Sequence, residues 1–150
     1  MSNEQRRIRG RCLCGAVQFE LTPPTDFCAH CHCQSCRLSH GAAFVTWTGV
    51  PLDRFAFVTG EGEVTWYRSS ASILWGSCSR CGSPMLYRAD QVGHPEAPKL
   101  DRMYVTAGSL LDPLDREPSA HVSYEERLAW SRWHDGLPKH RGKTDETMAD

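Results

Sequence analysis

The residues best suited to chemistry in this chain are its eight cysteines, which fall into three tight clusters. The clusters read C-x-C at 12–14, C-x-x-C-x-C-x-x-C at 28–36 and C-x-x-C at 78–81. Short cysteine pairs separated by long gaps are typical of tetrahedral zinc sites, because one tight turn supplies two thiolates and a distant pair completes the coordination sphere. The spacing therefore predicts zinc as the cofactor, with two ions per chain.

The first and third clusters are predicted to form one site with four thiolate ligands, namely Cys12, Cys14, Cys78 and Cys81. A glycine follows each pair, Gly15 and Gly82, and glycine readily adopts the left-handed backbone that a zinc-binding turn needs. A closed four-thiolate sphere has no open position, so this zinc is expected to be structural and its binding to stabilise the fold. Buried free thiols are the simpler alternative.

The middle cluster has a different pattern. If the segment is extended, Cys31 and Cys33 place their thiols on one side of it, and Cys36 returns through a turn as a third ligand. Three protein ligands with an open fourth position are typical of catalytic zinc. Such an ion can bind a substrate thiol and lower its pKa, which predicts Cys31, Cys33 and Cys36 as a catalytic metal site.

Cys28 leaves an alternative open. With Cys31 it forms a second C-x-x-C pair, and four thiolates would close the site. In an extended segment, however, Cys28 points to the face opposite Cys31 and Cys33. His30 and His32 share that opposite face, where each could cap a backbone carbonyl or lie at the surface; metal ligation by either is the minority interpretation.

Short β-strands are the elements that must position these cysteines. Val17, Phe19 and Leu21 alternate with polar residues, which is typical of a half-buried strand. Further strand-like runs lie at 44–47, 55–58, 64–67, 73–75, 85–87, 103–106 and 121–124. The turn at 60–62 is predicted to join 55–58 and 64–67 as a hairpin. No segment has a long 3.6-residue period, so an all-β domain with zinc knuckles and little helix is expected.

The length of 150 residues fits one domain. We predict a flexible N-terminus at 1–9, a zinc-binding β domain at 10–138 and a flexible C-terminal tail at 139–150. Residues 89–102, which are rich in proline and poor in apolar residues, are predicted to form a long surface loop.

Composition excludes several classes of protein. The chain has no apolar run of eighteen or more residues and no secretory signal, so we expect no membrane span and a cytoplasmic location, where reduced cysteines bind metal. The formal net charge of -1 lacks the basic footprint of a nucleic-acid-binding protein.

The cysteine motifs resemble those of the glutathione-dependent formaldehyde-activating enzyme family. The resembling segments read G-R-C-L-C-G-A-V at 10–17, C-H-C-Q-S-C-R at 31–37, C-S-R-C-G-S-P at 78–84, V-T-A-G-S-L at 105–110 and A-H-V at 120–122. The resemblance implies a β-rich fold of the β-tent type and the same pairing of ligands into two zinc sites. It also implies carbon–sulfur lyase activity that joins glutathione and formaldehyde into S-hydroxymethylglutathione. Cys28 departs from the family pattern.

Two functions from different classes remain as hypotheses. The first is a zinc-dependent carbon–sulfur lyase that adds a thiol such as glutathione to formaldehyde or a related small electrophile. Arg37 would then contact a glutathione carboxylate, with Arg68 and Arg88 as weaker candidates. His121 could act as a general acid, and a packed or surface histidine is the simpler interpretation. The second is a non-catalytic, zinc-stabilised binding module whose second zinc site is closed by Cys28. Neither hypothesis defines an oligomeric state.

Overall fold

The computed structural model describes residues 6–90 and 101–149, and short strands dominate this part of the chain. Among the described residues, α1 (Gln34–His40) is the single α-helix. The prediction of an all-β fold with little helix is therefore confirmed. The chain divides into two units: unit 1 comprises Met1–Asp26 and Thr48–Asp115, and unit 2 comprises Phe27–Trp47 and Arg116–Asp150.

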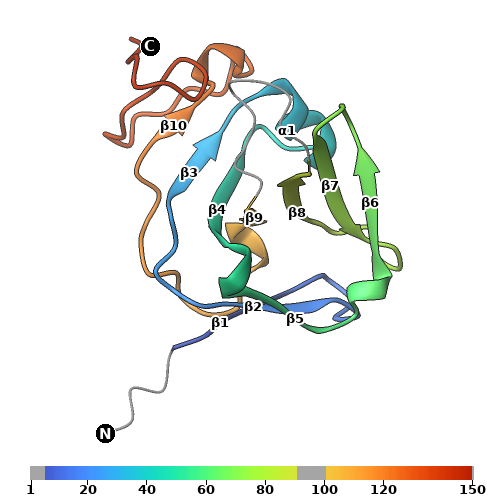
Figure 1. Ribbon diagram of the computed structural model, residues 1–150. Coiled ribbons are helices and arrows are strands. Elements are labelled where there is room, and N and C mark those ends of the chain that lie inside the picture. The colour runs from blue at the N-terminus through green and yellow to red at the C-terminus, as the bar shows by residue number, and fades with distance from the viewer. Residues whose placement is uncertain (1–5, 91–100, 150) are drawn as a thin grey trace, which may run out of the picture. The chain divides into compact units, whose positions relative to one another are not determined.

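Unit 1 contains a three-stranded antiparallel sheet in the order β1–β2–β5 (Figure 1). Its strands are β1 (Ile8–Arg11), β2 (Gln18–Leu21) and β5 (Phe55–Thr59). On β2 the alternation has its expected effect, because Phe19 and Leu21 are buried whereas Gln18 is exposed. The strand predicted around Phe19 is thus present.

Unit 1 also contains four strands that follow one another as antiparallel neighbours. They are β6 (Val64–Arg68), β7 (Ile73–Cys78), β8 (Pro84–Ala89) and β9 (Arg102–Thr106). The core of this unit draws on both groups of strands. Its buried residues are Ile8, Cys12, Val17, Phe19, Leu21, Val50, Cys78, Met85, Leu86, Met103 and Val105. Cys12 and Cys78 are among these buried core residues, so the core anchors the site formed by the first and third cysteine clusters.

The predicted hairpin between 55–58 and 64–67 is wrong. The strands β5 and β6 are present, but β5 pairs with β2 and β6 pairs with β7. Gly60 has a φ of 78° and the 3₁₀ turn Glu61–Glu63 follows it. This connection redirects the chain instead of folding it back on itself. The distant strand β2 satisfies the backbone of β5, and β7, the next strand along the chain, satisfies that of β6.

Unit 2 carries β3 (Cys28–Cys31), the start of β4 (Val45–Pro51) and β10 (His121–Val122). The chain passes into unit 1 within β4. The strands β3 and β10, far apart in sequence, lie side by side and pair in parallel, with Val122 opposite Cys31 (Figure 1). The 3₁₀ turn Tyr124–Glu126 follows β10.

Several predictions about chain organisation are not tested by this fold. In the C-terminal segment, Lys139 forms an isolated β-bridge with His121, and His140 forms one with Thr147. The proposed domain limits and the flexibility of 139–150 stay predictions, as does the flexibility of 1–9. Of the predicted loop at 89–102, residues 91–100 lie outside the described part of the chain.

No helix within the described residues is long and apolar enough to cross a membrane.

Candidate metal centres

The first and third cysteine clusters meet in unit 1. The sulfur atoms of Cys12, Cys14, Cys78 and Cys81 all lie within 4.8 Å of one another. Two of the separations are 3.6 Å, between Cys12 and Cys14, and 3.8 Å, between Cys14 and Cys78. Four sulfurs at zinc–sulfur distances of about 2.3 Å with tetrahedral angles lie about 3.8 Å apart. The donor set therefore fits a tetrahedral zinc ion.

Two glycine turns shape this cluster. Gly15 and Gly82 have φ angles of 79° and 77°, the left-handed backbone expected after each cysteine pair. Gly82 donates its N–H to the carbonyl of Cys78 at 2.8 Å, which closes the second turn. Ser83 links the two turns, because its Oγ accepts the N–H of Leu13 at 2.9 Å. Hydrogen bonds lower the pKa of Cys81 to about 5, first the bond with the hydroxyl of Ser83 and then those with the backbone of Cys14 and Ser83.

The middle cluster forms in unit 2 from two consecutive elements. Cys31 ends β3, Cys33 caps the N-terminus of α1, and Cys36 lies in its first turn. The three sulfurs lie within 4.8 Å of one another. As the N-cap, Cys33 accepts the backbone N–H of Cys36 at 3.3 Å, so the fold of the helix itself orients two of the three thiols.

Close packing controls which of these thiols ionises. The pKa of Cys33 is lowered to about 2, first by hydrogen bonding from the Cys31 thiol and then from Cys36. The pKa of Cys31 is raised to about 11, first by its interaction with Cys33, and the pKa of Cys36 is raised, first by Cys31. One thiolate thus suppresses ionisation of its neighbours, and a divalent cation is the partner that would stabilise all three as thiolates.

Cys28 is not a member of this cluster, although it lies on the same strand. It is buried, with 2% of its surface exposed, and its carbonyl accepts the N–H of Ser119 at 2.9 Å. Alternation along an extended segment explains the separation, because Cys28 and Cys31 are an odd number of residues apart. The cluster as described contains three sulfurs, not four.

Comparison with known proteins identifies the family. Residues 7–126 match the family model of the glutathione-dependent formaldehyde-activating enzyme. This chain belongs to that family. A crystal structure of a Rhodobacter sphaeroides protein is similar at a TM-score of 0.55 and 23% sequence identity, over 72% of this chain and 92% of that one. That likeness shows the shared fold.

In this member of the formaldehyde-activating family, the candidate arginines differ in their partners. Arg68 forms an ion pair with Asp90, and the guanidinium of Arg88 lies 6.0 Å from the ring centre of Trp66. Arg37 is half-buried on α1, and its Nε is buried without a hydrogen-bond partner among the described residues. Of the three, Arg37 is the cation next in sequence to the middle cluster.

The histidines form a network that the sequence did not predict. His32 is fully buried, not a surface residue, and its Nε2 lies 2.8 Å from Nδ1 of His121. His121, also fully buried, places Nε2 2.8 Å from Oδ2 of Asp135. Burial, followed by the charge of His121, lowers the pKa of His32 to about 4, so His32 stays neutral near pH 7. The position of Asp135 carries no motif that could have revealed it.

Lys143 is a second charged residue of unit 2, besides Asp135, to which sequence reasoning gave no role at the site. The positive charge of Lys143 contributes to lowering the pKa of Cys33, after the larger effects of the neighbouring thiols and the helix backbone. Lys143 lies in the predicted C-terminal tail, a segment to which the sequence assigned no chemistry. Only the folded chain relates it to the cysteine cluster.

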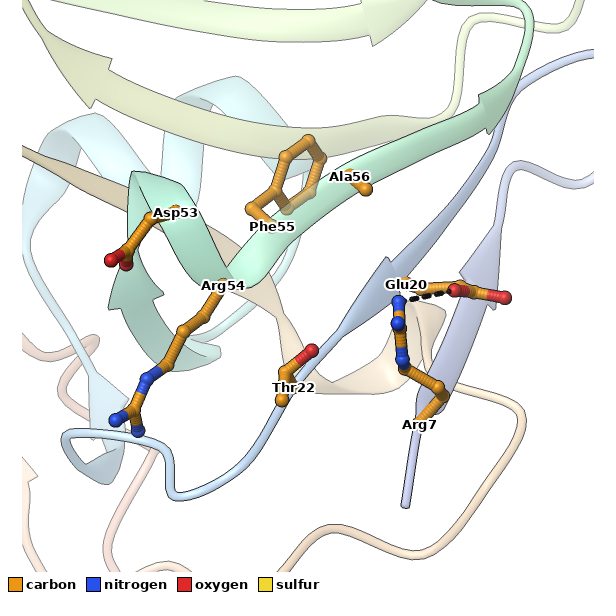
Figure 2. Close-up of a pocket in the computed structure, with 7 residues that line it drawn as sticks. All are labelled: Arg7, Glu20, Thr22, Asp53, Arg54, Phe55 and Ala56. Atoms are coloured by element: carbon orange, nitrogen blue, oxygen red, sulfur yellow. Dashed lines mark hydrogen bonds and ion pairs between the residues drawn. The ribbon is translucent and has the colours of Figure 1, made fainter. Parts of the chain in front are cut away.

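A polar pocket of about 200 Å³ also lies in unit 1 (Figure 2). It is lined by Arg7, Glu20, Thr22, Asp53, Arg54, Phe55 and Ala56. None of these residues is a cysteine or a histidine, and the guanidinium of Arg7 is already paired with Glu20 at 3.1 Å, as the dashed line in Figure 2 shows. The pocket therefore offers no thiol or imidazole, and the cysteine clusters remain the candidate centres.

Proposed function

We propose that this protein is a zinc-dependent enzyme of the carbon–sulfur lyase type. It adds a thiol such as glutathione to formaldehyde or to a related small electrophile. The family assignment supports the reaction class, and the three-sulfur cluster of Cys31, Cys33 and Cys36 supports the place where it occurs. In this proposal the four-thiolate cluster holds a purely structural zinc.

The observation that carries the proposal is the number of sulfurs in the middle cluster. Three thiolates would satisfy three positions of a tetrahedral ion, and Cys28 is not part of the group whose sulfurs lie within 4.8 Å of one another. When bound there, zinc supplies an open position and a positive charge that favours the thiolate form of a substrate thiol. The protein fixes the ligands through β3 and the N-terminal turn of α1, so little reorganisation is needed.

The proposed reaction is an addition that needs no external oxidant or reductant. The thiol of the substrate loses its proton, and its sulfur forms a bond to the carbonyl carbon. The π electron pair of the carbonyl moves to the oxygen, which takes up a proton. The product is a hemithioacetal, and the reverse reaction breaks the same C–S bond.

Arg37 is the proposed contact for a carboxylate of glutathione. It lies directly after Cys36, and among the described residues it forms no ion pair. A guanidinium binds a carboxylate through two parallel hydrogen bonds, which would position the thiol end of the same molecule. His121 is not proposed as a general acid, because it is fully buried and engaged with His32 and Asp135.

The test compares Cys33→Ser with the matched variant Cys28→Ser. Both remove one sulfur from the same short segment, but only Cys33 belongs to the three-sulfur cluster. Native mass spectrometry should find two zinc ions in the wild type and in Cys28→Ser, and one in Cys33→Ser. Exchange NMR of glutathione and formaldehyde should show catalysed interconversion with the hemithioacetal for the first two proteins only.

The alternative function, a zinc-stabilised binding module with a closed second site, predicts a different result. Cys28→Ser would then lose a zinc ion as readily as Cys33→Ser, and the wild type would not accelerate hemithioacetal exchange. Either finding would overturn the open-site enzyme.

A further inference from the structure

Two histidines and an aspartate converge in unit 2, and none of them belongs to either cysteine cluster. His30 of β3 and His121 of β10 are direct partners in the parallel pairing of these strands. Asp135, from the segment after β10, completes the group, and ligand atoms of all three side chains lie within 4.8 Å of one another. Nε2 of His121 and Oδ2 of Asp135 are 2.8 Å apart.

Each imidazole of this group is held by its other ring nitrogen. Nδ1 of His30 lies 2.7 Å from Oγ1 of Thr46, and Nδ1 of His121 lies 2.8 Å from Nε2 of His32. Histidines that bind metals commonly use their second nitrogen in such a bond, which fixes the orientation of the ring. Nε2 is then the nitrogen that each ring presents to an ion.

The surroundings hold these rings in place while leaving one side accessible. His121 is fully buried, and the ring of Trp133 stacks on it with the centres 6.0 Å apart. Phe44 contacts His30 edge-on at 5.0 Å. The side chain of Asp135, by contrast, is 31% exposed, so an ion can reach the group from solvent.

We propose that His30, His121 and Asp135 bind a first-row divalent transition-metal ion. The ligands are two imidazole nitrogens and one carboxylate oxygen. Cis ligands of an octahedral ion at about 2.1 Å lie about 3 Å apart, close to the separation of His121 and Asp135. Nitrogen and oxygen donors favour cobalt, nickel, iron(II) or zinc, and three protein ligands leave positions for water or a small ligand.

Binding changes the position of two protons. A carboxylate accepts only, so without an ion Nε2–H of His121 donates to Asp135, and Nδ1 of His121 accepts from Nε2–H of His32. An ion on Nε2 moves the proton of His121 to Nδ1, from which it donates to Nε2 of His32. His32 must then carry its proton on Nδ1, a buried atom without a partner among the described residues. This exchange opposes binding, so the site is weaker than the four-thiolate cluster.

The experiment is a cobalt(II) titration of tag-free protein whose cysteine sites are already loaded with zinc. The variants are Asp135→Asn and His30→Gln, with His134→Gln as the control because His134 is an exposed neighbour of Asp135 outside the group. Wild type and His134→Gln should bind one further cobalt ion with weak visible bands and no intense sulfur-to-cobalt absorption. Each of the other variants should weaken this binding by about tenfold or more.

Nitrogen-15 NMR of the imidazoles, with zinc as the added ion, provides a readout independent of affinity. His121 and His32 should both change tautomer as the site fills in wild type, and neither should change in Asp135→Asn. The proposal is overturned if cobalt enters only with sulfur-to-cobalt bands, if no further ion binds, or if Asp135→Asn binds it like the wild type. The three side chains would then form a hydrogen-bonded relay only.

Discussion

The indole N–H of Trp47 donates a hydrogen bond to the sulfur of Cys36, with Nε1 and Sγ 3.4 Å apart. Both side chains are buried, at 7% and 5% exposure. The imidazole of His40 packs edge-on against the Trp47 ring at 5.4 Å, which helps to fix the indole. A donor in this position favours the thiolate form of Cys36 and orients it, so Trp47 supports the middle cluster without being a ligand.

Replacing Trp47 by Phe should therefore weaken zinc binding at the middle cluster while the fold persists. Loss of a partner that hydrogen-bonds a ligand typically reduces metal affinity by about 10- to 100-fold. Chelator competition against the two-zinc protein measures this, with Trp75→Phe as the control, because Trp75 donates to Ser69 in unit 1. Equal zinc affinity in the two variants would contradict a role for the indole N–H.

The two cysteine clusters should respond differently to the loss of a ligand. Cys78→Ser should abolish soluble folding, because Cys78 lies in the hydrophobic core and a zinc ion bound by its cluster would join segments 64 residues apart in the chain. Cys33→Ser should leave a folded protein with one zinc ion fewer. Circular dichroism separates these outcomes, and an equal loss of structure in both variants would refute the division of roles.

Gly60→Ala should destabilise unit 1 strongly. Gly60 has a φ of 78°, and an added Cβ would lie 1.9 Å from the carbonyl oxygen of Ala16, a backbone atom that cannot move aside easily. We expect a loss of about 2–4 kcal/mol in the free energy of unfolding.

Gly62→Ala is the matched control two residues away, because nothing lies within 4 Å of its added Cβ. It should be neutral or stabilising by up to about 1 kcal/mol. Chemical denaturation of both variants measures the difference, and similar midpoints would show that the approach of Gly60 to Ala16 is not tight.

Asp112 should make stability depend on pH. Arg9 donates to Asp112 from its side chain and its backbone N–H, and these bonds, the side-chain bond first, hold the pKa of Asp112 below its ordinary value of 3.8. A carboxylate with a lowered pKa in the folded state stabilises it above the pKa of the unfolded chain, and the effect is lost as the pH falls.

Asp112→Asn should accordingly be less stable than the wild type at pH 7. The difference should shrink as the pH drops below about 3.8, where the unfolded wild type takes up a proton. Denaturant midpoints of both proteins across this range test the prediction. A difference that stays constant with pH would mean that the ionised carboxylate of Asp112 is not involved.

Local sequence was a good guide where neighbouring residues act together. The spacing of Cys31, Cys33 and Cys36 was enough to predict a cluster, because one strand end and one helical turn place all three sulfurs. The alternation around Phe19 likewise predicted β2. The predicted hairpin failed because the partner of β5 is β2, and strand pairing depends on distant segments that turn residues do not encode.

The sequence by itself determined which cysteines gather into groups able to hold a metal ion, the all-β class of the protein and its family, because cysteine spacing and side-chain alternation are local properties of the chain. Only the tertiary structure decided that Cys28 stands apart from the three-sulfur cluster and that Asp135 reaches His121. Those relationships depend on strand pairing and on segments returning from far along the chain, and no short motif records which distant residues will meet.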